Sequence, residues 1–215
     1  MSAINIYKQL RHYGLNHAGA CAMMGNLMAE SSLISNIAQR GMTNLSDDEY
    51  TAKFNSAPDS CYRDGVGYGL AQWTYWSRKK NLFEFAYTHG ISVGDEEIQI
   101  DFLVHELKTE YSGLYKYLCS TTDMYEATSR ICKEYERPAV NNIDTRYNFA
   151  QIIDRDFAEE SQPGYTQQSD VKRVDQSILI LQAVLVANGY NVEITGHKSA
   201  PFFAALREFV KDIGG

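Results

Sequence analysis

Residues 25–35 read GNLMAESSLIS and say more about this chain than any other segment. An apolar stretch ends at Glu30 and gives way to small polar residues. Upstream of Glu30 the apolar side chains recur at helical spacing, which predicts a helix over residues 18–31 with one buried face. Glu30 is therefore expected in the last turn of a helix, where the backbone holds it rigidly.

A second informative segment, residues 67–74, reads GYGLAQWT. Its glycines allow the backbone to approach a ligand closely because no side chain intervenes. The Gln72 amide can both donate and accept hydrogen bonds, and the rings of Tyr68 and Trp73 are flat enough to stack on a sugar. This pattern predicts one wall of a binding groove. The alternative is a simple turn in which Trp73 fills the core.

The position of Glu30 suggests acid chemistry. The negative end of the helix dipole disfavours an ionised carboxylate there, and partial burial acts in the same direction. A carboxylic acid that keeps its proton can protonate the leaving oxygen of a glycosidic bond. Together with the facing loop, this predicts a glycosidase in which Glu30 is the general acid.

Two residues compete for the place of a second carboxylate. Asp64 lies just before the glycine loop, where it could face Glu30 across a cleft, and it is the predicted catalytic partner. Glu136 lies at the expected end of a helix and is predicted to line the groove, although an ion pair with neighbouring Arg137 is an equal alternative. The predicted substrate-binding residues are Tyr68, Gln72, Trp73 and Glu136.

Composition excludes several functions. The formal net charge of −7 disfavours a nucleic-acid partner, because binding a phosphate backbone requires a basic face. No apolar run approaches the ~18 residues of a membrane span, so membrane insertion is not expected. The N-terminus shows no basic region followed by an apolar core, which predicts synthesis and folding in a cytoplasm without a signal peptide.

Cysteine and histidine spacing argues against a metal or another cofactor. The four cysteines form no CxxC pair, and the five histidines do not pair at ligand spacing. Cys21 raises one alternative, a thiol nucleophile near a helix start, where the dipole favours the thiolate. Cysteine–histidine peptidases also need a histidine on a strand, and the sequence predicts no convincing strand for one.

The chain as a whole is predicted to be mainly α-helical, with a catalytic domain over residues 1–158. Residues 58–73 form the one long irregular stretch, with a short hairpin expected inside it. A polar segment with Pro163-Gly164 predicts a linker over residues 159–170. Residues 171–215 are then expected to form a small helix–loop–helix unit. The helices expected in the catalytic domain cover residues 3–13, 18–31, 46–55, 77–87, 95–110, 113–119, 122–136 and 143–158. Ser46 and Glu49 form the pattern of a capping box, which predicts the start of the third of these helices.

The ordered motifs of residues 1–158 resemble the phage tail-type lysozyme domain, a branch of the lysozyme-like glycosidases. The matching segments are CAMMGNLMAES (21–31), GLAQWT (69–74), QIDFL (99–103) and YERP (135–138), with Arg78, Leu82, Arg146 and Ala150. The resemblance implies a helical lysozyme-like fold with Glu30 as the catalytic acid. It also implies peptidoglycan glycan strands as the substrate and a phage origin.

Residues 171–215 resemble a small helical peptidoglycan-binding repeat, although Thr195-Gly196 replaces the usual Asp-Gly. A catalytic domain joined to such a unit is the layout of an endolysin, made in the host cytoplasm and released through holin pores to act on the cell wall. The expected activity is that of a muramidase rather than a glucosaminidase. The alternatives are a lytic transglycosylase and a non-catalytic wall-binding or tail-structural protein.

Overall fold

The computed structural model describes residues 3–158, residue 185, residues 189–191 and residue 205. By its internal contacts the chain divides into two units, Met1–Tyr165 and Thr166–Gly215. The predicted linker over 159–170 lies outside the described residues, and so does nearly all of the predicted unit over 171–215. The helices and side-chain contacts are thus known for residues 3–158.

Residues 3–158 are mainly α-helical, as the sequence predicts. The elements are α1 (Ala3–His12), α2 (His17–Ser31), α3 (Asp47–Ser56), α4 (Asp59–Tyr62), α5 (Trp76–Thr88), α6 (Glu96–Thr109), α7 (Ser112–Ser120), α8 (Met124–Arg130), the π-helix η1 (Ile131–Glu136) and α9 (Ile143–Phe157). This part of the chain has no β-sheet; its β-structure consists of isolated bridges that pair Tyr68 with Ala38 and with Trp73.

Local sequence signals set most of these boundaries. The capping box expected at Ser46 forms: the Ser46 hydroxyl accepts from the Glu49 backbone N–H, and the Glu49 carboxylate accepts in return from the Ser46 backbone N–H. Two features differ from the prediction. The short helix α4 interrupts the irregular stretch, and the helix predicted over 122–136 turns into the wider π-helix at Ile131.

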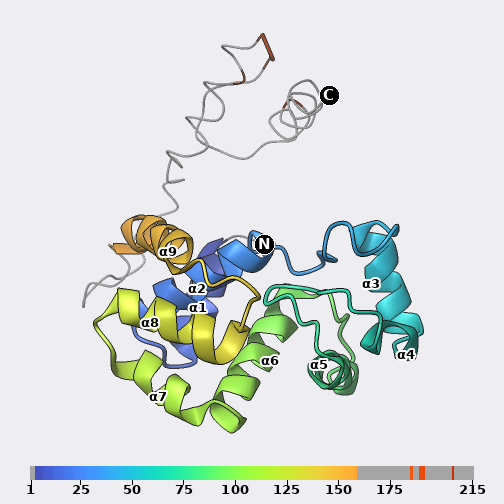
Figure 1. Ribbon diagram of the computed structural model, residues 1–215, viewed down its shortest axis with the longest axis horizontal. Helices are drawn as coiled ribbons and strands as arrows, with labels where there is room; N and C mark the ends of the chain where they lie inside the picture. The colour runs from blue at the N-terminus through green and yellow to red at the C-terminus, as the bar shows by residue number, and fades with distance from the viewer. Residues whose placement is uncertain (1–2, 159–184, 186–188, 192–204, 206–215) are drawn as a thin grey trace. The chain divides into compact units, whose positions relative to one another are not determined.

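The helices form two groups joined by α6 (Figure 1). One group holds α1, α2, α7, α8 and α9, and the other holds α3, α4 and α5. Helix α6 contacts α1 and α7 on one side and α5 on the other. Helix α2 lies inside the first group, in contact with α1, α7, α8, η1 and α9, and all residues from 19 to 27 are buried. The C-terminal end of α2 therefore carries Glu30 out of a rigid core.

The close packing of α9 against α2 depends on Gly25. A Cβ atom at this position would lie 2.5 Å from the backbone oxygen of Arg146 and 2.8 Å from the Cβ of Ala150. Because glycine has no Cβ, the two helices approach closely here. That approach places Arg146, in the first turn of α9, beside the C-terminal turn of α2, where its side chain reaches Glu30.

Among the described residues, every helix is too short or too polar to cross a membrane.

Candidate active site

A cavity of about 1160 Å³ opens where the two helix groups meet. Its wall combines the end of α2 with residues 32–42, residues 65–78, the junction of α6 and α7, and the segment that follows η1. Of the predicted site residues, Glu30, Gln72 and Glu136 line it. The structure thus brings together side chains that are more than a hundred positions apart in the sequence.

Glu30 occupies the last turn of α2. The helix stops there because Ser32 and Leu33 both adopt left-handed backbone conformations, with φ of 56° and 60°, and the Ser32 backbone N–H donates to the Met28 carbonyl. The Glu30 side chain is 18% exposed, and its Oε1 accepts a hydrogen bond of 2.6 Å from Nη2 of Arg146. This cationic partner comes from a helix more than a hundred residues away and has no signal in the sequence around Glu30.

Arg146 is held from two directions. Its side chain is only 6% exposed, and Nη1 donates to the backbone oxygen and Oδ1 of Asn26 at 3.4 and 3.3 Å. Asn26 is itself buried and donates to the Ala22 carbonyl. The guanidinium is therefore fixed before any ligand arrives, and it fixes the Glu30 carboxylate in turn.

Glu136 ends the π-helix and differs from Glu30 in its surroundings. Its Oε1 is shielded from solvent and has no hydrogen-bond partner among the described residues. Burial, and after it the negative charge of Glu30, raise the pKa of the Glu136 carboxyl well above its usual range, although Arg78 and Arg146 oppose the shift. A raised pKa favours the protonated form of Glu136, and that form can donate a hydrogen bond into the cavity.

Backbone strain gathers around the same cavity. Within the described residues, the non-glycine positions with positive φ are Ser32, Leu33, Gln72 and Arg137. All of them except Leu33 line the cavity. Such conformations cost about 1–3 kcal/mol each and concentrate at functional sites, as do π-helical turns. The strain therefore supports a functional cavity independently of the carboxyl groups.

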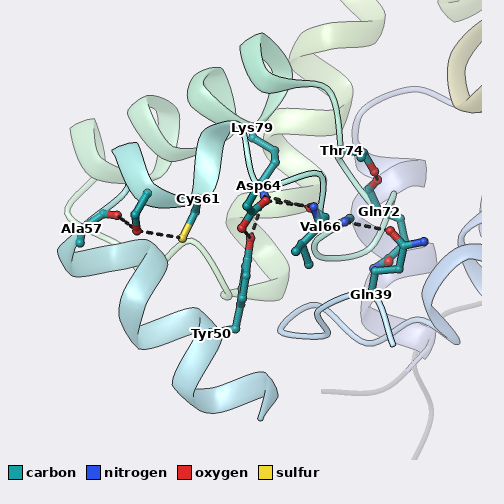
Figure 2. Close-up of polar contacts among 11 residues, drawn as sticks. Gln39, Tyr50, Ala57, Cys61, Asp64, Val66, Gln72, Thr74 and Lys79 are labelled. Carbon is teal, nitrogen blue, oxygen red and sulfur yellow. Dashed lines mark hydrogen bonds and ion pairs between the residues drawn. The ribbon is translucent and has the colours of Figure 1, made fainter. Parts of the chain in front are cut away.

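Gln72 keeps its predicted place in the groove. It lines the cavity with a φ of 46°, and its Nε2 donates to the Gly69 carbonyl at 3.0 Å. Gln39 and Thr74 lie beside it around Gly67 (Figure 2), where a Cβ atom would meet all three side-chain oxygens at 3.0–3.2 Å. This cluster offers amide and hydroxyl groups to a polar ligand.

The predicted stacking roles of Tyr68 and Trp73 need correction. Both rings are buried, at 0% and 1% exposure, and neither lines the cavity. The Tyr68 hydroxyl lies 2.7 Å from Thr51 Oγ1, and Trp73 Nε1 donates to Glu106 at 2.9 Å. The alternative, in which Trp73 fills the core, describes the structure. Gly69 likewise makes room for the buried Gln99 amide and not for a ligand.

Asp64 is also placed differently from its prediction. Its Oδ1 accepts from Lys79 Nζ at 2.8 Å and its Oδ2 from the Tyr50 hydroxyl at 2.7 Å (Figure 2). Oδ1 also accepts from the Val66 backbone N–H. Asp64 is not among the residues that line the cavity. Its carboxylate is occupied by the buried Lys79 ammonium, so the structure does not bring it to Glu30 as a catalytic partner.

The sequence does not predict the pairing of Arg78, in the cavity wall, with the buried Glu106 behind it. Arg78 lines the cavity and donates to both oxygens of the buried Glu106 carboxylate, at 2.8 and 2.7 Å. The hydroxyl of Tyr135, a cavity-lining residue, also donates to Glu106. The local sequence around Glu106 does not predict these contacts, because the partners Trp73, Arg78 and Tyr135 come from other parts of the chain.

Cys21 does not support the thiol-nucleophile alternative. It lies in the second turn of α2, fully buried, and burial together with the Asp154 charge raises its pKa to about 12. The neighbouring His17 ring is held between the Tyr7 hydroxyl and the Asp154 carboxylate, at 2.7 and 2.6 Å. A thiol with so high a pKa is almost entirely protonated at neutral pH and is a poor nucleophile.

The helical scaffold surrounds a large cavity whose lining includes an ion-paired carboxyl group at Glu30 and one with a raised pKa at Glu136. Such a site is suited to glycosidic bonds. Comparison with known families is more specific. Residues 2–157 match the family described as phage tail lysozyme, and the chain belongs to this family. Membership implies a glycoside hydrolase whose substrate is peptidoglycan. No individually curated protein matches the sequence.

Proposed function

We propose that the protein hydrolyses β-1,4 glycosidic bonds of bacterial peptidoglycan as a muramidase, with Glu30 as the general acid. The observation that carries this proposal is the shared cavity of Glu30 and Glu136. Glu30 is ion-paired with Arg146 there, and Oε1 of Glu136 is shielded and has no hydrogen-bond partner among the described residues. Family membership supplies the substrate class, and the cavity supplies the chemistry.

In the proposed mechanism, the protonated form of Glu30 delivers its proton from the end of α2 to the leaving oxygen as the glycosidic bond breaks. Water then attacks the anomeric carbon and returns a proton to Glu30. Arg146 fixes its position before and after the transfer, and its charge stabilises the carboxylate that remains. Glu136 and Gln72 donate hydrogen bonds to hydroxyl or acetamido oxygens of the bound saccharide. The strained backbone at Ser32 and Arg137 holds the two carboxyl-bearing segments in place.

Asp64 no longer has a part in this mechanism, and its absence from the cavity favours one alternative. A lytic transglycosylase uses a single carboxyl group first as acid and then as base, and releases an anhydro-sugar. Glu30 is the ion-paired carboxylate of the cavity, whereas Glu110, which also lines it, is an exposed residue directly after α6. Because Asp64 does not line the cavity, a reaction that uses Glu30 alone is the second candidate.

Mass spectrometry of muropeptides released from purified cell walls tests both candidates. New reducing ends at N-acetylmuramic acid from the wild type, absent with Glu30→Gln, are the expected result. Anhydro-sugars in their place would move the assignment to the transglycosylase. Release of equal amounts by both proteins would remove Glu30 from the chemistry.

We also propose that the protein acts as an endolysin on the host cell wall. The support is the layout of the sequence, in which residues 171–215 resemble a peptidoglycan-binding repeat. Expression in a bacterial cytoplasm with and without a pore-forming holin tests this role. Lysis that depends on the holin and on Glu30 is expected, and lysis from outside only would favour a tail-associated role.

A further inference from the structure

A second surface cavity adjoins the proposed active site. It has a volume of about 480 Å³ and is lined by Tyr62, Arg63, Gly65, Thr74, Tyr75 and Trp76. Gly65, Thr74 and Tyr75 also line the main cavity. The two cavities therefore lie side by side and share part of one wall at Gly65, Thr74 and Tyr75.

The aromatic side chains of this second cavity are unusually accessible. Tyr75 is 64% exposed and Trp76 is 38% exposed, although both belong to residue types that are usually more buried. Their ring centroids lie 6.2 Å apart at an interplanar angle of 43°. Two exposed adjacent rings at the edge of a polar cleft offer flat apolar faces, with a polar hydroxyl on Tyr75.

Arg63 adds a positive charge to the same surface. Its guanidinium carbon lies 4.4 Å from the centroid of the Trp76 ring, a cation–π contact. Arg63 is exposed and forms no salt bridge among the described residues. In a protein of net charge −7, a cation without an acidic partner beside exposed rings is suited to an anionic ligand.

We propose that Tyr75, Trp76 and Arg63 form a distal saccharide subsite for the glycan strand that is bound in the main cavity. The rings stack on the face of an N-acetylhexosamine, and Arg63 pairs with a carboxylate that the strand carries. This inference rests on the proposed function for the identity of the ligand. The continuity of the two cavities is the reason for choosing a glycan over a separate protein partner.

The tryptophans provide a probe that needs no catalysis. The chain contains two of them; Trp73 is buried, whereas Trp76 lies in the proposed subsite. In the Glu30→Gln background, soluble peptidoglycan strands of graded length are added while acrylamide quenches the exposed tryptophan. Long strands are expected to protect Trp76, and a Trp76→Phe variant is expected to lose this response. Strands that bind by calorimetry without protecting Trp76 would overturn the subsite.

Kinetics with intact Glu30 give a second readout. Trp76→Ala is expected to raise KM about 2- to 10-fold on long strands and to leave the shortest cleaved strand unaffected, because Trp76 lines the second cavity and not the main one. Tyr87→Ala is the matched control, because Tyr87 is 73% exposed on the same helix and lines neither cavity. Equal effects at all strand lengths, or none at any length, would contradict the proposal.

The charge component is separable from stacking. Arg63→Met is expected to weaken binding of carboxylate-bearing strands more than binding of neutral chitin oligosaccharides of the same length. Equal weakening of both ligands would show that Arg63 binds no carboxylate. Protection of Trp76 in a wild type that cleaves nothing would refute the proposed function and leave the subsite standing.

Discussion

Two carboxylate–cation pairs lie close to the cavity, and they differ in how completely they are satisfied. Lys79 donates to Asp64, to the Tyr50 hydroxyl and to the Val66 carbonyl, which uses all three of its protons. In the Glu30–Arg146 pair, by contrast, Nε of Arg146 has no partner among the described residues, and neither has Oε1 of the neighbouring Glu136. A saturated pair stabilises the fold, whereas unsatisfied buried atoms beside a cavity mark where a ligand binds.

The pKa shifts follow the same division. Burial lowers the pKa of Lys79 against the opposing effect of Asp64. Burial also works to raise the pKa of Asp64, but hydrogen bonds from Lys79 and Tyr50 outweigh it and lower that pKa. Both charges are therefore retained at neutral pH, each by the other. In the cavity, burial and then the negative charge of Glu30 raise the pKa of Glu136 well above its usual range.

The largest expected effect separates activity from stability. Glu30→Gln removes the proposed general acid and should lower kcat about 10²- to 10⁴-fold. The free energy of unfolding should change by less than about 1 kcal/mol, because Arg146 also acts on the Glu136 carboxyl, which can ionise and balance the Arg146 charge once Glu30 is neutral. Turnover of cell walls and urea denaturation measure the two effects. A strongly destabilised Glu30→Gln protein would mean that the Glu30–Arg146 pair stabilises the fold, as the Asp64–Lys79 pair does.

Asp64→Asn should show the reverse behaviour. Removing one partner of a buried pair leaves an uncompensated charge and costs about 3–5 kcal/mol, here through the fully buried Lys79. Residual activity per folded molecule should stay near that of the wild type. The double variant Asp64→Asn with Lys79→Met is the matched control and should recover part of the loss. A stable Asp64→Asn protein without activity would restore the predicted catalytic role.

The sequence predicted the elements well and the partners of the site only in part. Helical spacing and the Ser46 capping box are local features, and they placed the helices within a few residues. The location of Glu30 at the end of α2 followed from the same local pattern. Arg146 and Glu106 could not be paired with Glu30 and Arg78 from spacing alone, because these contacts depend on how distant helices pack.

The aromatic residues show this limit most clearly. Trp73 and Trp76 are three positions apart in the sequence, yet one is buried and the other is exposed. The tight turn that pairs Tyr68 with Trp73 directs both of these rings into the core. The chain leaves that turn at Thr74 and starts α5 at Trp76, which places the next two rings on the surface. Composition could predict aromatic side chains near the site but not which of them faces the cavity.

A smaller effect tests the packing that fixes Arg146. Gly25→Ala would set a Cβ atom 2.5 Å from the Arg146 backbone oxygen, and such overpacking costs about 1–3 kcal/mol. The shift of α9 should also reduce activity by misplacing Arg146. Gly113→Ala is the control, since a Cβ atom there meets nothing within 4 Å and lies in helix α7. It should be neutral or stabilise by up to about 1 kcal/mol. A harmless Gly25→Ala would show that α2 and α9 need not approach so closely.

The smallest effect concerns the pH dependence of stability at Glu136. Because the folded-state pKa of this carboxyl is raised above its unfolded value, the folded protein binds the extra proton between those two values. Stability is therefore lost as pH rises through that window. Glutamine mimics the neutral form and cannot ionise, so Glu136→Gln should become increasingly more stable than the wild type as pH rises from about 4 towards neutrality. Thermal melting of both proteins across this range measures the difference. A difference in melting temperature that does not change with pH would mean that Glu136 ionises normally in the folded protein. Glu136 would then be a second carboxylate in the cavity and not a hydrogen-bond donor.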